Sequence, residues 1–267
     1  MTLPIVSLEQ GSIPLLISIP HGGEYLPEAY ARRMTPAARK LADTDWHLSR
    51  LYDFARKMGA SMVRANYSRY VIDVNRPSDG AALYPGQTTT TLCPVATFHG
   101  EPVYLDPADV PGTAETAQRV HDYWKPYHDN LDAELQRVRG QHGHVLMWEA
   151  HSIASELPYL FEGRLPDLNI GTFSGAACAP ALREAAMAAA AAGPYTWVID
   201  DRFKGGHITR HYGRPQDGVH AVQLEMAQCV YMDETEPYGY REDLANKLLP
   251  TLEAMVKNTY QALIKAG

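Results

Sequence analysis

Two short segments place metal-binding residue types directly after apolar runs. The segment LLISIPHGGE contains His21 and ends with Glu24. A second apolar run, VLMWEA, is followed directly by His151. Two imidazoles and one carboxylate, with a fourth position left open, form the ligand set of a hydrolytic zinc site. A metal held in this way lowers the pKa of bound water to about 7 and polarises a carbonyl group. The simpler alternatives are a turn at Glu24 and a hydrogen-bonded core histidine at His151.

A further carboxylate, Glu225, interrupts the otherwise apolar run AVQLEM. A carboxylate in such a place must be paired, protonated or turned toward a cavity at the end of a strand. Partial desolvation would raise its pKa and suit it to take a proton from water and pass it to a leaving nitrogen. Glu225 is therefore the candidate catalytic base.

The segment SRYVIDVNRP carries Arg69, Asn75 and Arg76 around a predicted strand at residues 70–74. A guanidinium group suits bidentate binding of a carboxylate, so the segment predicts an anion-binding site. The alternative reading of any single arginine is a surface salt bridge.

A second basic segment, residues 200–218, holds Arg202, Arg210 and Arg214 among glycines, although the whole chain has a formal net charge of −7. A flexible loop with that much positive charge in an acidic protein predicts a cover over a bound anion. No block of lysine and arginine stands out elsewhere, which argues against a surface for nucleic acid or anionic membrane.

Short apolar runs predict the strands that must position these residues. They are residues 15–19, 61–65, 70–74, 145–150, 196–200 and 221–226. Helical patterns lie between them at residues 36–58 after a cap at Thr35, 114–138 with a kink at Pro126, 178–192, and 241–264. This alternation predicts an α/β domain with a mainly parallel or mixed sheet, whose ligands gather at the carboxyl ends of the strands.

The composition favours an intracellular globular protein. The chain has 267 residues, of which 45% are hydrophobic, so it can bury a sizeable core. Its three cysteines are far apart and form no Cys-x-x-Cys pair, which argues against a disulfide framework or a cysteine metal site. No signal peptide and no membrane-spanning apolar run is evident, and we expect a cytoplasmic location.

Six motifs in order give the chain a resemblance to the N-formylglutamate amidohydrolase family. They are SIPHGGEYLP, DTDWHLSRLY, SRYVIDVNRP, AHSI, FKGGHITRHYGRP and HAVQLEMAQCVYMDE. Each motif alone is weak, but six in order are highly specific, and they span most of the chain. The family is also similar in logic to zinc carboxypeptidases and aspartoacylases.

The resemblance implies a single three-layer α/β/α domain over residues 1–267, with a mixed, mainly parallel sheet similar to that of zinc carboxypeptidases. It implies metal-dependent hydrolysis of N-formyl-L-glutamate to formate and L-glutamate, the last step of one histidine-degradation route. It also implies one divalent metal ion, with zinc as the default, and a small-molecule substrate. It leaves the oligomeric state open.

The resemblance also assigns roles to individual residues. His21 and His151 are implied as metal ligands, with Asp45 of DTDWH as the third ligand and Glu24 as its rival. The remaining assignments are Glu225 as catalytic base, and Asn75 and Arg76 as binders of a substrate carboxylate with Arg69 close by. Because the implied substrate has two carboxylates and one arginine seldom serves both well, we expect Arg210 of the glycine-flanked loop to bind the other, in preference to Arg202 and Arg214.

Two rival functions remain open at the level of sequence. One is a related N-acyl amino acid amidohydrolase or a small carboxypeptidase with the same metal site. The other is a non-catalytic anion-binding protein on the same fold. A serine hydrolase is disfavoured because the chain has no Gly-x-Ser-x-Gly motif.

Overall fold

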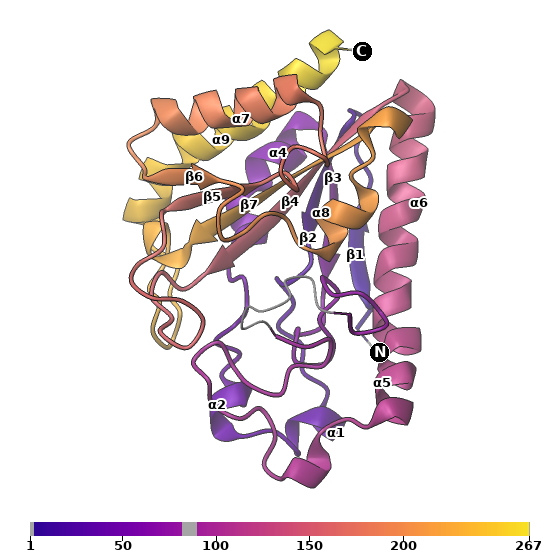
Figure 1. Ribbon diagram of the computed structural model, residues 1–267, viewed down its shortest axis with the longest axis vertical. Coiled ribbons are helices and arrows are strands. Elements are labelled where there is room, and N and C mark those ends of the chain that lie inside the picture. The colour runs from indigo at the N-terminus through magenta and orange to yellow at the C-terminus, as the bar shows by residue number, and fades with distance from the viewer. Residues whose placement is uncertain (1–2, 82–89, 267) are drawn as a thin grey trace.

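A seven-stranded sheet forms the centre of the computed structural model, which describes residues 3–81 and 90–266 (Figure 1). The strands are β1 (Val6–Glu9), β2 (Leu15–Ile19), β3 (Ser61–Ala65), β4 (Val145–Ile153), β5 (Leu168–Gly171), β6 (Trp197–Ile199) and β7 (Val219–Ala227). Their order in the sheet is β1-β3-β2-β4-β7-β5-β6. Strands β3, β2, β4 and β7 are parallel, whereas β1, β5 and β6 run in the opposite direction. The predicted mixed, mainly parallel sheet is confirmed.

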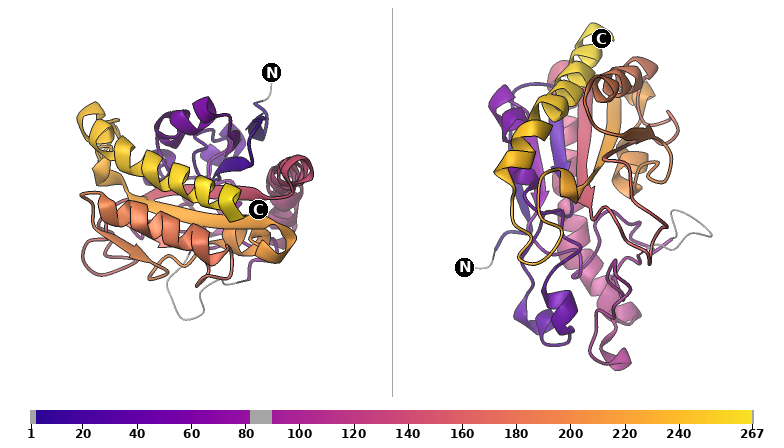
Figure 2. Two further views of the ribbon diagram at one scale, coloured as in Figure 1. Left: turned by 90° about the horizontal axis from the view of Figure 1, so that it is seen from above. Right: turned by 90° about the vertical axis from the view of Figure 1, so that its left-hand side faces the viewer.

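Helices cover both faces of this sheet. The α-helices of the described residues are α1 (Glu28–Ala31), α2 (Pro36–Arg39), α3 (Leu48–Leu51), α4 (Asp53–Met58), α5 (Thr113–Arg119), α6 (Lys125–His142), α7 (Pro180–Ala192), α8 (His207–Tyr212) and α9 (Glu242–Ala266). One face packs against α4, α7 and α9, and Figure 2 shows α7 and α9 side by side. The other face packs against α6 and α8, which confirms three layers. Among the helices described, none is long and apolar enough to cross a membrane.

The side chains of β4 explain why buried polar residues lie together at one end of one face of the sheet. Successive residues of a strand point to opposite faces, so Val145, Met147, Glu149 and His151 form one row. The first two pack in the core under α6, whereas the last two are polar and still buried. The row therefore changes from apolar to polar as it reaches the carboxyl end of the strand.

Strand β7 repeats this pattern in register with β4. Val219 and Ala221 lie in the same core as α6, and Gln223 and Glu225 follow them in the row. Gln223 pairs with Glu149 and Glu225 with His151 across the two parallel strands. The row on the other face of β7 stays apolar to its end and packs against the opposite helical layer.

Several predicted elements are wrong in their bounds or type. Residues 70–74 form buried turns rather than a strand, because Asp73 is bound by side chains there instead of by a strand ladder. The predicted helix at residues 36–58 is broken into α2, α3 and α4, although Thr35 does cap α2 by accepting from the amide of Ala38. The short strands β1 and β5 were not predicted.

The predicted helix at residues 114–138 is continuous but changes type along its length. A π-helical turn at Val120–Trp124 joins α5 to α6. Pro126 lies in the first turn of α6, so the irregularity precedes the proline instead of centring on it. The predicted helix at residues 178–192 is confirmed as α7, which begins two residues later and has Gly193 as its C-cap.

We expect Leu146→Ala to lower the free energy of unfolding by about 2–5 kcal/mol. Leu146 is a residue of β4 whose side chain is fully buried in the core. Urea denaturation followed by circular dichroism measures the change. The matched control is Leu105→Ala, whose side chain is 55% exposed and should change stability by about 0.5 kcal/mol or less. Equal effects of the two substitutions would contradict the placement of Leu146 in the core.

Candidate metal centre and active-site cavity

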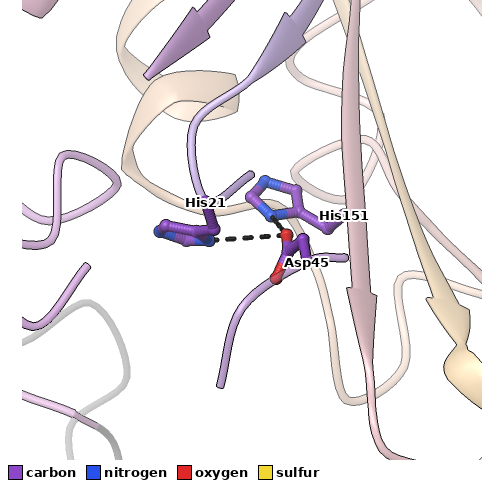
Figure 3. Close-up of side chains that lie close together, drawn as sticks. All are labelled: His21, Asp45 and His151. Atoms are coloured by element: carbon purple, nitrogen blue, oxygen red, sulfur yellow. Dashed lines mark hydrogen bonds and ion pairs between the residues drawn. The ribbon is translucent and has the colours of Figure 1, made fainter. Parts of the chain in front are cut away.

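His21, Asp45 and His151 converge at the carboxyl end of the central strands (Figure 3). All three are buried, and one ligand atom from each lies within 4.8 Å of the others. Oδ2 of Asp45 lies 3.0 Å from Nδ1 of His151 and 3.7 Å from Nδ1 of His21. Two imidazole nitrogens and a carboxylate oxygen thus face one point, as the ligands of a divalent metal do.

The sheet topology brings the two histidines together. His151 lies in β4, and His21 lies two residues beyond the end of the adjacent parallel strand β2. The chain leaves β2 for β3 on one side and later returns as β4 on the other side. The connections diverge at this point, and ligands of open α/β sheets bind in the crevice that such a divergence leaves.

Asp45 comes from the turns that interrupt the predicted helix. Its amide donates to the carbonyl of His21 at 3.1 Å, and the side chain of Gln228 donates to the carbonyl of Thr44 at 3.0 Å. Leu41 and His47, on either side, adopt left-handed backbone conformations with φ of 54° and 62°. Such a conformation costs an ordinary residue roughly 1–2 kcal/mol, so these contacts must stabilise an otherwise strained segment.

A buried carboxylate binds the outer nitrogen of each histidine. Nε2 of His21 lies 2.7 Å from Oδ1 of Asp73, and Nε2 of His151 lies 2.6 Å from Oε1 of Glu149. Asp73 and Glu149 are fully buried. Metal-bound histidines almost always donate their second ring N–H to such a partner, which fixes the ring and its tautomer. The arrangement of these residues therefore fits a metal ion at the inner nitrogens.

Sequence reasoning missed both of these carboxylates. Glu149 in MWEAHS and Asp73 in VIDVN each interrupt an apolar run, as Glu225 does. That same signal, a charge that must be compensated if it is buried, could have identified them.

Asn75 has a structural role that the sequence did not predict. Its side-chain nitrogen donates to Oε1 of Glu149 at 2.7 Å, and its oxygen accepts from the amide of Ile208 at 2.8 Å. The hydroxyl of Thr209 donates to the other oxygen of Glu149. Asn75 lines the cavity described below, but its amide group already links Glu149 to the start of α8.

The electrostatics keep the carboxylates of the centre ionised. Burial raises the pKa of Asp45, but hydrogen bonds with His151 and His21 outweigh it and lower that pKa to about 2. Burial likewise raises the pKa of Asp73, and the charges of His21 and two arginines bring it well below the usual range. The centre is therefore rich in negative charge, which a divalent cation would balance.

A cavity of about 100 Å³ opens beside the three residues. Both polar and apolar side chains line this cavity, and Glu225 is one of the polar ones. The residues lining it are His21, Asp45, Arg69, Asn75, Arg76, Thr90, Phe98, His151, Ser152, Ile153, Leu160, Arg202, Phe203, Gly206, Gln223 and Glu225.

Glu225 lies in this cavity with only 8% of its surface exposed. Burial raises its pKa to about 8, although the positive charge of His151 opposes this shift. A carboxyl group with such a pKa can both accept and return a proton near neutral pH.

The other predicted residues divide between the cavity and the surface. Arg69 and Arg76 line the cavity, whereas Glu24 is exposed and lies outside the three-residue cluster. Arg210 is not among the described residues that line the cavity. Its guanidinium lies 4.8 Å from the centre of the Phe173 ring, and its Nε donates to the carbonyl of Gly205 at 2.8 Å. Arg202, which was the less favoured candidate for binding a substrate carboxylate, does line the cavity.

The chain is similar to known proteins over most of its length. The family model for N-formylglutamate amidohydrolase matches residues 13–232. N-formylglutamate deformylases from Pseudomonas putida and Pseudomonas aeruginosa are 51% and 49% identical to the chain, over 98% of it and 97% of each relative. A crystal structure of N-formylglutamate amidohydrolase from Ralstonia eutropha has a TM-score of 0.82 at 21% identity and covers 98% of this chain and 99% of that one. At that identity the structural likeness shows the fold alone.

We expect the purified protein to bind one divalent ion and Asp45→Asn to bind it much more weakly, because the neutral amide is a far poorer ligand than the carboxylate. Elemental analysis and titration with a metal indicator measure stoichiometry and affinity. The matched control is Glu24→Gln, which should bind metal as the wild type does, since Glu24 is exposed. Metal loss in Glu24→Gln alone would contradict the ligand set and restore the rival ligand.

We expect Glu149→Ala to weaken metal binding by about 10–100-fold, because it removes the acceptor that orients His151. Glu149→Gln keeps an oxygen at that place and should lose less affinity. The control is Glu156→Ala on the exposed segment after β4. If Glu149→Ala and Glu156→Ala bind metal equally well, Glu149 has no part in holding the histidine.

Proposed function

The chain belongs to the N-formylglutamate amidohydrolase family, and we propose that it hydrolyses the formamide bond of N-formyl-L-glutamate to give formate and L-glutamate. The observation that carries this proposal is the convergence of His21, Asp45 and His151 with Glu225 in one cavity that arginines also line. Ligands for a Lewis acid, a proton acceptor and anion-binding groups are the parts that hydrolysis of an anionic amide requires.

His21, Asp45 and His151 would hold the metal, and zinc is the ion that we propose. Their donor set of two imidazole nitrogens and one carboxylate oxygen is the one that hydrolytic zinc sites use. When bound, such an ion polarises the carbonyl of the formyl group and acidifies water. Asp73 and Glu149 keep the rings of the two histidines turned toward it.

Glu225 is the proposed base. It takes a proton from the attacking water and returns it to the nitrogen of glutamate when the C–N bond breaks. Its place in β7, directly across from His151 in β4, fixes it beside the metal ligands. Its burial keeps the proton affinity high enough for both transfers.

Arg76 and Arg202 are the proposed partners of the two carboxylates of the substrate. Arg76 is fixed by bonds to Thr90, from Nε to the carbonyl at 3.0 Å and from one terminal nitrogen to the hydroxyl at 2.8 Å. Arg202 donates to the carbonyl of Leu160 at 2.6 Å. Both arginines line the cavity that also holds Glu225, so each is available to one carboxylate of a bound dicarboxylate. This proposal replaces Arg210 with Arg202.

We expect the wild-type protein to release formate from N-formyl-L-glutamate, and a chelator to stop the release until a divalent ion is restored. Glu225→Gln should lower kcat by about 10²–10⁴-fold while it keeps the metal, because the amide cannot accept the proton. A coupled formate dehydrogenase assay measures the rate. The control is Glu156→Gln at an exposed position. No formate from metal-loaded wild type would refute the proposed activity.

We expect Arg76→Ala and Arg202→Ala each to raise KM at least tens-fold, since loss of a buried partner of a charge costs about 2–5 kcal/mol. Comparison of N-formyl-L-glutamate with N-formyl-L-glutamine tells the two arginines apart. The variant that lacks the partner of the side-chain carboxylate should lose the preference for glutamate, whereas the other variant should keep it. Unchanged KM in both variants would contradict the assignment.

A further inference from the structure

We propose that Phe98 restricts the acyl group of the substrate to formyl, because its ring closes the active-site cavity at the place where a longer acyl group would extend. The inference rests on the proposed function and names the residue that selects the acyl group. It bears directly on the rival that the sequence left open, an amidohydrolase for other N-acyl amino acids.

The active-site cavity shares one wall with a second, smaller cavity. Phe98, Ser152 and Ile153 line both cavities, whereas the other residues around the smaller cavity do not line the larger one. The smaller cavity has a volume of about 10 Å³, compared with about 100 Å³ for the active-site cavity. The three shared residues therefore form a partition, and the space behind it has room for about one water molecule.

Phe98 is the member of this partition that a substitution can remove without disturbing the sheet. Ser152 and Ile153 belong to β4, and both pair with residues of β7 there. Phe98 comes from a turn outside the sheet, and its ring is the largest of the three side chains. Loss of the ring would therefore join the two cavities.

The partition lies beside the two candidate histidine ligands. Ile153 follows His151 in the same row of β4, about 7 Å further along the strand. The centre of the Phe98 ring lies 4.6 Å from the guanidinium of Arg69, which binds the same carboxylate as His21 does. A substituent on the carbon that is attacked would thus meet this wall if it points away from the polar groups of the cavity.

The groups on that carbon divide among the parts of the cavity. Its nitrogen leads to glutamate, whose two carboxylates we propose to lie at Arg76 and Arg202. Its oxygen and the attacking water must lie beside the candidate metal ligands and Glu225. One substituent remains, which is a hydrogen in a formyl group and a methyl in an acetyl group.

The apolar side chains of the cavity show where this remaining substituent would lie. Among the described residues that line the cavity, Phe98, Ile153, Leu160 and Phe203 have apolar side chains. Arg202 donates to the carbonyl of Leu160, and its guanidinium lies 5.8 Å from the centre of the Phe203 ring. Leu160 and Phe203 therefore belong to the end that we assign to a substrate carboxylate. This leaves the wall formed by Phe98 and Ile153 for the acyl substituent.

Contacts with its backbone and ring fix Phe98 in this place, as a steric limit requires. Its amide donates to Oδ2 of Asp43 at 2.9 Å, and only 8% of its surface is exposed. The amide of Gly100 closes the turn by donating to the carbonyl of Thr97 at 2.9 Å. A Cβ at Gly100 would lie 2.7 Å from the ring of Tyr159, so the turn packs closely against that residue. Phe98 therefore has little freedom to move aside for a methyl group.

The test compares the wild type with Phe98→Leu and Phe98→Ala, each at measured metal content, on N-formyl-, N-acetyl- and N-propionyl-L-glutamate. Release of L-glutamate, measured with glutamate dehydrogenase, gives kcat/KM for all three substrates. We expect the wild type to prefer formyl over acetyl by at least about tenfold, and Phe98→Ala to lower this preference by about 10–200-fold, the effect of one carbon in a closed pocket. Phe98→Leu should lower it less, and because it keeps more of the packing it provides the test if Phe98→Ala does not fold.

Two control variants change the neighbouring space without opening the partition. Leu157→Ala enlarges only the smaller cavity, because Leu157 does not line the larger one. Phe203→Leu alters only the active-site cavity, at the end that holds Arg202. Both should keep the preference of the wild type for formyl over acetyl, whatever their effect on the overall rate.

Three results would overturn the inference and leave the proposed function intact. The first is a wild type that cleaves the acetyl substrate as efficiently as the formyl substrate. The second is an unchanged preference in the folded, metal-loaded variants of Phe98. The third is an equal loss of preference in Leu157→Ala or Phe203→Leu, which would indicate general loosening of the site. Failure of metal-loaded wild type to cleave N-formyl-L-glutamate would instead overturn the proposed function together with this inference.

Discussion

The structure depends on the burial of four carboxylates at one end of one sheet face. Asp45, Asp73, Glu149 and Glu225 are between 0% and 8% exposed. A buried charge without a partner costs several kcal/mol, so Asp45, Asp73 and Glu149 must find positive charge or hydrogen-bond donors nearby, whereas burial raises the pKa of Glu225 to about 8. Two imidazoles, two arginines and the donors of Asn75 and Thr209 provide part of that compensation. The negative charge that remains is what suits the cluster to a divalent cation.

This requirement fixes the loops as well as the strands. The chain around Gly206 must approach Asn75 so closely that a Cβ there would lie 2.4 Å from its side-chain nitrogen. Gly206 donates to Gln223 at 2.7 Å, and this contact places Thr209 of α8 over Glu149. Gly23 is needed for a similar reason, since its Cβ would lie 2.2 Å from the carbonyl oxygen of Tyr67. The glycines near the centre thus permit close packing around the histidines.

The central strands could be predicted from the sequence because most of their runs are nearly all apolar over five or six residues. The strand predicted at residues 70–74 is wrong, since a buried turn held by Asp73 has the same apolar composition as a strand. Asp45 was identified through family resemblance, because its segment reads as helix and is unwound only by tertiary contacts. The His-x-x-Glu spacing suggested Glu24, which is exposed. The spacing of two residues in a motif gives only their separation along the chain. Metal binding depends on which side chains the fold brings to one point.

The same reasoning applies to the arginines. Local sequence shows where positive charge is plentiful but not which guanidinium already has carboxylate neighbours. Arg69 is paired with Asp73 beside the candidate metal ligands, whereas Arg202 comes from a separate loop and also lines the cavity. Because like charges in a buried site repel strongly, the proposed substrate with two carboxylates needs positive charge away from the buried acids. The positions of these acids, which the local sequence does not show, therefore decide which arginines of the cavity we propose as partners of the substrate.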